Sequence, residues 1–369
     1  MNREQLLRQF QDANSRDVEA ALLREQLDES ALVALLSDAA APYLEALARR
    51  AQTTTLQRFG RTIQLYAPLY LSNECVNRCT YCGFSQELAI PRRTLSVDAV
   101  RTEAEHLHAE GFRHLLLVAG ESPRAVSLEY LESIARALRP RFDSLAIEVG
   151  TFNLTGYQRL VAAGIDGLTL YQETYQTDAY RRVHLAGPKH DYARRLKAVE
   201  QGALAGFRSL GIGALLGLAP WQLEAYALAQ HGRELGLKYW RSRIAVSFPR
   251  IRENAGGRLA THPVSDRALV QMICVMRLAL PDAELVLSTR EPATLRDHLM
   301  GIGITRMSAG SRTNPGGYTE DCAAGEQFAI EDTRSASEVA RVLLTRGFEP
   351  VWKDFDRSFL APSCASEVA

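Results

Sequence analysis

Leu71–Phe84 reads LSNECVNRCTYCGF, and this stretch decides the architecture that we expect. Cys75, Cys79 and Cys82 are three of the six cysteines in 369 residues, and their spacing is Cys-x3-Cys-x2-Cys. Three thiolates so close in sequence can converge on one soft metal centre, and they leave one coordination position without a protein ligand. A small molecule can bind and react at such an open position. The sequence therefore predicts an open metal site.

Other uses of these cysteines fit less well. Structural zinc usually takes four ligands, often as two separate Cys-x2-Cys pairs. No second pair exists, because the remaining cysteines are isolated at Cys274, Cys322 and Cys364. An odd cluster of three cannot pair internally as disulfides, and nothing in the sequence suggests export. We therefore favour an iron–sulfur cluster, with zinc or redox thiols as the alternatives.

The cysteine motif, with Tyr81 before its last cysteine, resembles the cluster-binding loop of the radical S-adenosylmethionine (SAM) enzymes. In that family three cysteines hold a [4Fe–4S] cluster, and SAM chelates the fourth iron through its amino and carboxylate groups. The resemblance implies Cys75, Cys79 and Cys82 as metal ligands and the cluster and SAM as cofactors. We expect Tyr81 and Phe84 to lie at the cofactor, because apolar cover keeps water off a reducing cluster.

Charge and hydropathy limit the classes of protein to which this chain can belong. Lysine plus arginine equals aspartate plus glutamate, at 43 each, so net charge gives no argument for nucleic acid or a membrane surface as partner. No run of eighteen apolar residues predicts a transmembrane helix, and the charged N-terminus lacks a signal-peptide core. We expect a cytoplasmic enzyme, in a reducing compartment that suits thiolates holding iron.

From Thr62 onward, apolar strand-like runs alternate with helical segments. Eight strands in this order predict a parallel sheet, and favour a closed (β/α)8 barrel of the TIM type, complete or nearly so. We expect a helical extension over residues 1–57, the barrel over 58–318 and a C-terminal segment packing on the barrel over 319–369. The expected strands are Ile63–Leu71, Leu115–Val118, Leu145–Val149, Gly167–Tyr171, Ser209–Leu216, Ser242–Val246, Glu284–Ser288 and Ile304–Met307. Five glycines are expected to end helices in left-handed conformation, namely Gly111, Gly164, Gly206, Gly236 and Gly303.

Chemistry in such barrels gathers at the C-terminal ends of the strands. The second strand ends Val118-Ala-Gly-Glu-Ser122, which resembles the family's Gly-Gly-Glu element that binds the SAM amino group, although Ala119 replaces the first glycine. Gly120 allows close backbone approach, and Glu121 can accept hydrogen bonds from an ammonium group. A capped turn is the alternative for this stretch.

The third and fourth strands also end in carboxylates. Glu148 closes the third strand and is a candidate for a supporting or substrate-binding role. The fourth strand runs into a polar, aromatic stretch around Glu173, which we expect to bind the cofactor. Arg195 lies on the following helix, and arginine suits planar carboxylates, so we expect it to reach the SAM carboxylate. A surface salt bridge is the alternative for Arg195.

The last two strands end Ser288-Thr-Arg-Glu291 and Thr305-Arg-Met-Ser-Ala-Gly-Ser-Arg312. Arginines and hydroxyls at one barrel mouth suit a second small carboxylate or amino acid beside SAM. The candidates for substrate binding are Ser288, Arg290, Ser308 and Arg306. The alternative for Arg306 and Arg312 is that they stabilise the loop.

Several stretches together resemble the 2-iminoacetate synthase family, the tyrosine lyases of thiamine biosynthesis, from about Leu65 to Asp356. They are CTYCGF, YQETY with GPK downstream, STRE, SAGSRTNPGGY and the closing PVWKDFD. In the related tyrosine lyase of hydrogenase maturation, a C-terminal extension carries a second cluster on a Cys-x2-Cys pair. This chain has a lone Cys364 there, which argues against that enzyme.

The resemblance implies a radical SAM lyase that cleaves the Cα–Cβ bond of L-tyrosine to 2-iminoacetate (dehydroglycine) and p-cresol. The cluster and SAM would carry the chemistry, so no catalytic side chain is assigned. The resemblance also implies thiazole synthase as the partner that receives the imine, and a flavodoxin or ferredoxin as electron donor. The alternatives are a lyase for another aromatic amino acid, such as tryptophan, and a non-catalytic iron–sulfur or zinc protein.

Overall fold

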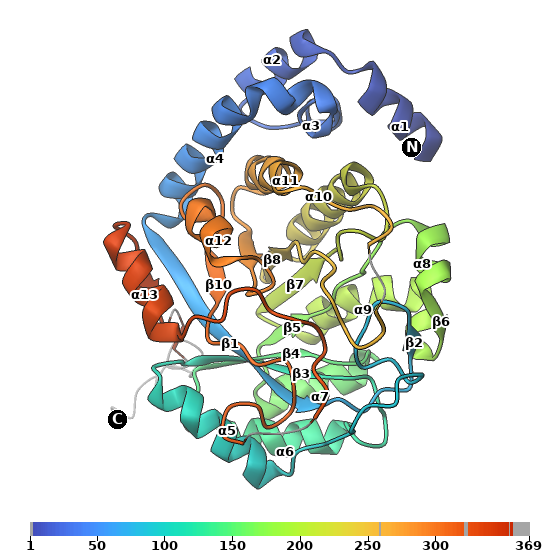
Figure 1. Cartoon of the computed structure of the whole chain (residues 1–369), viewed down its shortest axis with the longest axis vertical. Helices are drawn as coiled ribbons and strands as arrows, with labels where there is room; N and C mark the ends of the chain where they lie inside the picture. Colours follow the sequence, from blue (N-terminus) through green and yellow to red (C-terminus); the bar gives the residue numbers. More distant parts are fainter. Residues whose placement is uncertain (1–2, 258–259, 321–323, 354, 357–369) are drawn as a thin grey trace, which may run out of the picture.

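Eight parallel strands close into a barrel in the computed structural model, which describes residues 3–257, 260–320, 324–353 and 355–356 (Figure 1). The strands neighbour one another in the order β10-β9-β8-β7-β5-β4-β3-β1, and β1 pairs with β10 to close the ring. Their bounds are β1 (Thr62–Ser72), β3 (His114–Ala119), β4 (Ser144–Glu148), β5 (Gly167–Thr169), β7 (Ser209–Gly213), β8 (Arg243–Ser247), β9 (Glu284–Leu287) and β10 (Arg306–Ser308). The predicted (β/α)8 architecture is confirmed.

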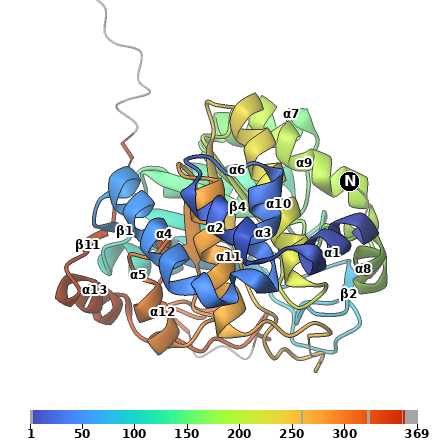
Figure 2. The same cartoon turned by 90° about the horizontal axis from the view of Figure 1, so that it is seen from above.

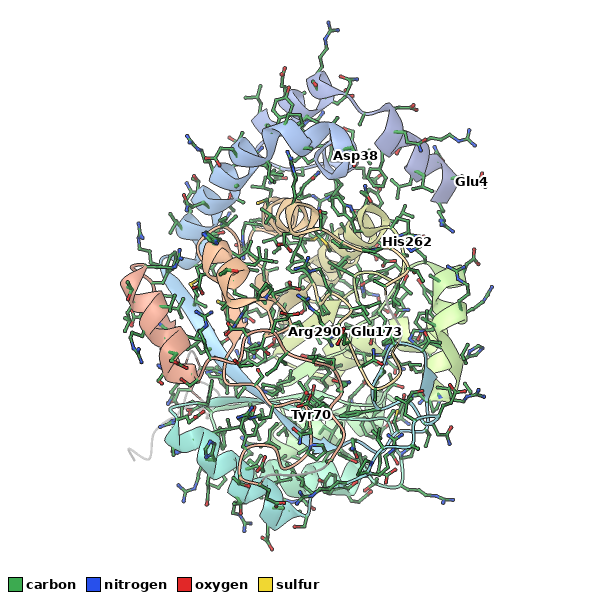
Figure 3. The ribbon with its side chains drawn as sticks, in the orientation of Figure 1. Glu4, Asp38, Tyr70, Glu173, His262 and Arg290 are labelled. Carbon is green, nitrogen blue, oxygen red and sulfur yellow. The ribbon has the colours of Figure 1, made fainter. Side chains whose placement is uncertain are left out.

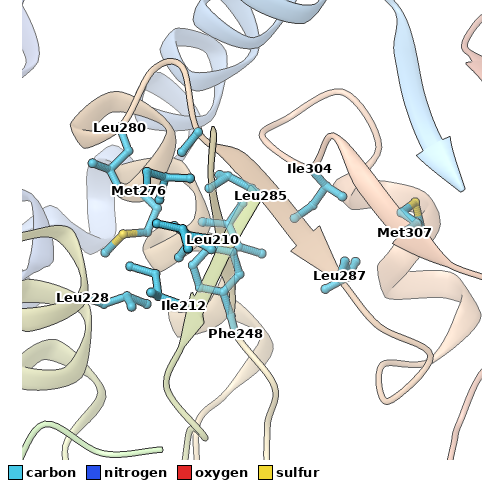
Figure 4. Packing of buried hydrophobic residues seen from close by; sticks show 14 of the residues in the cluster. Leu210, Ile212, Leu228, Phe248, Met276, Leu280, Leu285, Leu287, Ile304 and Met307 are labelled. Carbon is cyan, nitrogen blue, oxygen red and sulfur yellow. The ribbon is translucent and has the colours of Figure 1, made fainter. Parts of the chain in front are cut away.

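Alternate residues along the strands enter two separate apolar clusters, as the period of two requires. In β4, Leu145 and Ile147 belong to the large cluster beneath the surrounding helices, whereas Ala146 belongs to a smaller cluster. Figure 4 shows part of the large cluster, where Leu210 and Ile212 of β7 lie near Leu228 and Met276. The smaller cluster contains Tyr70 and Phe84, and Cys75 and Cys82 pack against it.

Helices connect the strands and cover the outside of the barrel (Figure 1). They are α5 (Val97–Ala109), α6 (Leu128–Leu138), α7 (Leu154–Ala163), α9 (Tyr192–Ala205), α10 (Trp221–Lys238), α11 (Asp266–Ala279) and α12 (Ala293–Leu299). Gly111, Gly164 and Gly206 have positive φ, as predicted. The prediction for Gly236 is wrong because α10 continues through it, and the left-handed glycine after α12 is Gly301 rather than Gly303.

The N-terminal helices pack on α10 and α11 at one side of the barrel, as Figures 1 and 2 show. They are α1 (Arg3–Asp12), α2 (Ser15–Leu23), α3 (Glu29–Leu36), the 3-10 helix η1 (Asp38–Tyr43) and α4 (Leu44–Phe59). Gln271 of α11 donates to the carbonyls of Leu35 and Ser37, at 2.9 and 3.0 Å, which satisfies the C-terminal end of α3. The three-part division of the chain stays a prediction.

No single described helix is both long and apolar enough to cross a membrane. One pair of segments, Glu29–Leu36 and Asp38–Phe59, reaches that length and composition only when taken together, and it is bent by 78°. The cytoplasmic location stays a prediction.

Five short elements and one helix were not predicted from the sequence. The strands β2 (Arg78–Cys79) and β6 (His184–Ala186) form an antiparallel pair that holds the cysteine loop, flanked by α8 (Thr177–Val183) and η2 (Pro188–His190). Beyond the barrel, α13 (Ala336–Thr345) leads to β11 (Glu349–Val351), which extends the sheet beside the start of β1. Cys322 and Cys364 lie outside the described residues.

Candidate active site

The three cysteines lie in the loop after β1, at the C-terminal end of the barrel. Burial raises the pKa of the Cys79 thiol to about 12, against the opposing charge of Lys189, and Cys82 and Cys75 raise it further. Burial also raises the pKa of Cys82, with Cys75 as the next cause. Thiols that resist ionisation and oppose one another's charge need a cationic centre among them, because a coordinated thiol is deprotonated outright. The donor set therefore fits a thiolate-bound metal centre.

Among the described residues, no three His, Cys, Asp or Glu side chains are arranged to hold one metal ion. In an iron–sulfur cubane each cysteine binds a different iron, so its ligands need not converge on one point. The choice of a cluster over a single ion at these thiols stays a prediction.

Two glycines let backbone segments pass close to the cysteine loop. A Cβ on Gly120 would lie 2.3 Å from the Glu74 carbonyl oxygen and 3.0 Å from Cys75 Cβ. A Cβ on Gly83 would lie 2.5 Å from the carbonyl oxygens of Glu326 and Gln327. Larger side chains at either position would displace the loop, so both glycines are required by space.

Aromatic side chains fix the two sides of the loop. Phe84 packs edge-on against Tyr70, with ring centroids 5.9 Å apart. The Tyr81 hydroxyl lies 2.7 Å from Nε2 of His184, whose Nδ1 lies 2.9 Å from the Tyr180 carbonyl oxygen. Burial lowers the pKa of His184 to about 2, so the ring is neutral, and we assign Nδ1 as its donor and Nε2 as acceptor from Tyr81. Tyr81 is thus held in one orientation beside the cysteines.

Glu173 is the residue among those described that has positive φ without being glycine, at 69°. Its carboxylate accepts from Lys189 Nζ at 2.7 Å and lies 3.7 Å from Arg195 Nη2. Burial opposes ionisation of Glu173, but Lys189 and Arg195 outweigh it and hold its pKa below the ordinary value. Glu173 is therefore ionised at neutral pH, and the strained backbone points to a functional position.

Arg195 and Glu121 lie at the same end of the barrel. Arg195 is buried, and its Nε donates to the Tyr171 carbonyl oxygen at 2.7 Å, which rules out the surface salt bridge. Glu121 accepts from Asn77 Nδ2 at 2.7 Å, and Asn77 belongs to the cysteine loop. Contact of either residue with SAM stays a prediction.

Glu224 of α10 holds the turn that carries Glu173. Its carboxylate accepts from Thr174 Oγ1 at 2.5 Å and from the Tyr175 backbone N–H at 2.8 Å. Burial raises the pKa of Glu224 to about 7. This role could not be predicted from the sequence, because Glu224 and Thr174 are 50 residues apart and Glu224 lies in an ordinary helical pattern.

A cavity of about 60 Å³ lies at the barrel mouth, and it is lined by Ser288, Arg290 and Ser308. The Arg290 guanidinium lies 3.3 Å from the centre of the Phe328 ring, and burial lowers its pKa. The Ser308 hydroxyl accepts from the Thr289 N–H at 3.1 Å. Figure 3 labels Arg290 and Glu173 near the middle of the barrel in this view. A half-buried arginine beside hydroxyls suits a small carboxylate.

Arg306 does not line this cavity, and its assignment to the substrate group stays a prediction. It pairs in register with Gln64, two residues before Ser308, so it lies one layer deeper in the barrel. There it stacks over Tyr66 at 4.7 Å and bonds to Glu284 at 3.4 Å. It lines a second cavity deeper in the barrel, which adjoins the first because both are lined by Tyr66 and Tyr171.

A segment that the sequence reasoning missed crosses the barrel mouth. This mouth segment, residues 326–332, bonds to the cysteine loop, where Gly83 N–H donates to the Gln327 carbonyl at 3.0 Å. It also bonds to the end of β9, because Glu331 and Asp332 donate to the Thr289 carbonyl. Phe328 supports Arg290, as described above. The segment has no helical or strand period, so no pattern marked it.

Gln327 links the two parts of the site. Its Oε1 accepts from the Tyr70 hydroxyl at 2.7 Å, and its Nε2 lies 3.9 Å from Cys82 Sγ. Tyr70 lines the cavity that Arg290 lines. One side chain therefore connects a cysteine of the loop to the wall of the cavity.

Comparison with known proteins agrees with this geometry. The family model of the radical SAM superfamily matches residues 69–228, and that of the Biotin and Thiamin Synthesis associated domain matches residues 247–349. Fold and site together define a radical SAM enzyme. The 2-iminoacetate synthases of Escherichia coli (strain K12) and Salmonella typhimurium are 45% and 44% identical over 341 residues, which cover 92% of this chain and 90% of each relative. The chain belongs to the 2-iminoacetate synthase family.

A solved structure extends the similarity to the whole fold. The crystal structure of HydG, a maturase of the [FeFe]-hydrogenase, has a TM-score of 0.91 and 29% identity to this chain. The match covers 98% of this chain and 84% of HydG. The family predicted from the cysteine motif and the strand-end stretches is confirmed.

Proposed function

We propose that this protein cleaves the Cα–Cβ bond of L-tyrosine to 2-iminoacetate and p-cresol as a radical SAM carbon–carbon lyase. The observation that carries the proposal is the 45% identity to a 2-iminoacetate synthase over 92% of the chain. The site supports it, because a cavity lined by the half-buried Arg290 adjoins a loop of three thiols. A site of this kind can hold an amino acid beside a cluster.

The residues of the chain divide between two ligands. We propose that Cys75, Cys79 and Cys82 hold a [4Fe–4S] cluster and that the SAM-binding residues are Tyr81, Phe84, Gly120, Glu121, Glu173 and Arg195. When bound, the cluster and SAM supply a radical that removes a hydrogen atom from the substrate. Ser288, Arg290 and Ser308 would hold the substrate carboxylate, so that the reacting atoms meet in one geometry. The mouth segment limits access of water to that geometry.

We also propose the partners that this reaction needs. The imine product hydrolyses readily, so direct transfer to thiazole synthase would protect it. Reduction of the cluster requires a one-electron donor, for which a flavodoxin or ferredoxin is suitable.

An anaerobic product assay tests the proposed function. Reconstituted protein, incubated with SAM, dithionite and tyrosine, should release p-cresol and 5′-deoxyadenosine only when tyrosine is present. Parallel reactions with tryptophan and phenylalanine measure the choice of substrate. Deoxyadenosine release without p-cresol, or cleavage of tryptophan in place of tyrosine, would contradict the assignment.

Gln327→Ala is expected to uncouple SAM cleavage from tyrosine cleavage. The substitution removes the hydrogen bond to Tyr70, and a buried hydroxyl left without a partner costs about 1–3 kcal/mol. We expect p-cresol formation to fall roughly 10-fold, while deoxyadenosine release in the absence of tyrosine persists. Gln86→Ala, at an exposed position near the cysteine loop, is the matched control. Equal loss of both products in Gln327→Ala would instead indicate a damaged cluster.

A further inference from the structure

Glu148 presents a carboxylate to the substrate cavity without using it in the fold. Glu148 is the last residue of β4, on the same side of the strand as Ala146, which belongs to the smaller apolar cluster. It also lines the cavity that Arg290 lines. Within the described part of the chain, its carboxylate makes no hydrogen bond or ion pair. Glu148 is half-buried, and carboxylates at such positions are often paired, so this one is available to a ligand.

Glu148 is near residues proposed for both ligands. Arg290, the candidate for binding the substrate carboxylate, lines the same cavity as Glu148. The charges of Glu173, Lys189 and Arg195 also act on the Glu148 carboxyl, and of these Glu173 and Arg195 are proposed to bind SAM. Burial, followed by the charge of Glu173, raises the pKa of Glu148 to about 7, and the three cations oppose the shift. The hydroxyls of Tyr70 and Tyr171 also line the cavity.

An amino acid zwitterion needs one cation and one anion a few ångströms apart. Arg290 supplies the cation for the carboxylate. The α-amino group is bonded to the carbon atom next to that carboxylate. Its partner must therefore lie within a few ångströms of the place where Arg290 holds the carboxylate. Glu148 lines the same cavity as Arg290, and among the described residues its carboxylate has no hydrogen-bond or ion-pair partner. The phenol hydroxyl of tyrosine is at the opposite end of the molecule from the carboxylate that Arg290 would hold. It is therefore too far from Arg290 to be the group that Glu148 binds.

We propose that Glu148 binds the α-amino group of the substrate and so makes the site specific for free α-amino acids. This inference rests on the proposed function for the identity of the substrate. A charge-assisted hydrogen bond to an ammonium group predicts that removal of the amine weakens binding roughly 10- to 100-fold.

Binding of three ligands to the reconstituted enzyme tests the proposal, measured anaerobically by calorimetry with SAM present and no reductant, so that nothing turns over. The ligands are L-tyrosine, 3-(4-hydroxyphenyl)propanoate, which lacks the amine, and L-phenylalanine, which lacks the phenol hydroxyl. Wild type should prefer tyrosine to the desamino compound by the factor above. In Glu148→Gln that preference should fall to a few-fold or less, while the ratio of tyrosine to phenylalanine is unchanged.

Further variants separate this role from others. Glu148→Asp keeps the charge and should restore part of the amine preference, whereas Glu105→Gln, an exposed carboxylate on α5, should leave all three affinities unchanged. The proposal is overturned if Glu148→Gln keeps the amine preference, loses the tyrosine-to-phenylalanine ratio instead, or weakens SAM binding. If wild type makes no p-cresol, the proposed function fails separately, and the same comparison with tryptophan and 3-(indol-3-yl)propanoate still tests Glu148.

Discussion

Cys79→Ala is expected to abolish both cluster binding and turnover. Cys79 is buried in the cysteine loop, which packs on the smaller apolar cluster. The charges of the Cys75 and Cys82 thiols act on the Cys79 thiol. With two ligands left, the cubane loses its protein anchor at a second iron, and loss of a metal ligand removes binding free energy that also stabilises the fold. Iron content, the broad visible absorbance and deoxyadenosine release should all fall to background. The same result is expected for Cys75→Ala and Cys82→Ala.

Cys274→Ala is the matched control for this experiment. Cys274 is also buried, but it lies in α11 within the large apolar cluster. Its loss should leave iron content unchanged and cost only the packing of one sulfur atom. Retention of full iron content in Cys79→Ala, or its loss in Cys274→Ala, would contradict the assignment of the cluster ligands.

Arg290→Ala is expected to weaken tyrosine binding without weakening SAM binding. Removal of one partner from a buried, hydrogen-bonded charge pair costs about 2–5 kcal/mol, or a factor of roughly 30 to several thousand in affinity. The tyrosine concentration needed for half-maximal p-cresol formation should rise accordingly, while uncoupled deoxyadenosine release persists. Arg290→Lys should recover little, because lysine cannot reproduce the planar, two-pronged geometry or the stacking on Phe328.

Arg312→Ala provides the comparison for Arg290. Arg312 follows the same group of strand ends but is exposed. Its removal should change the tyrosine requirement by less than about 2-fold, the range of an exposed charge. An unchanged tyrosine requirement in Arg290→Ala would remove Arg290 from the substrate site.

The barrel could be predicted because each strand is an apolar run and each helix follows with its own period. The period of a strand or helix predicts which face of the element a side chain occupies. It does not predict how deep along the barrel axis that side chain lies. Arg306 and Ser308 share one face of β10, yet the register with β1 places Arg306 one layer below the cavity. The position of Arg306 outside the cavity therefore follows from its depth along the barrel axis, which only the pairing of strands defines.

The site was predictable where chemistry is concentrated in one short stretch and hidden where it depends on distant partners. The three cysteines of the loop lie close together with a specific spacing, so the sequence alone was enough to predict a metal site there. Gln327 acts on Tyr70 across 257 positions of sequence, and His184 acts on Tyr81 across 103. The left-handed backbone of Glu173 had no marker either, because its support comes from Glu224 in another helix.

The central claim is that the cluster keeps one iron free for SAM, and electron paramagnetic resonance of the dithionite-reduced protein tests it most directly. We predict a [4Fe–4S]+ signal whose g-values shift when SAM is added, and hyperfine coupling to the amino nitrogen when SAM carries 15N. A reduced cluster whose spectrum is the same with and without SAM, or a protein that binds no iron when reconstituted anaerobically, would contradict the account.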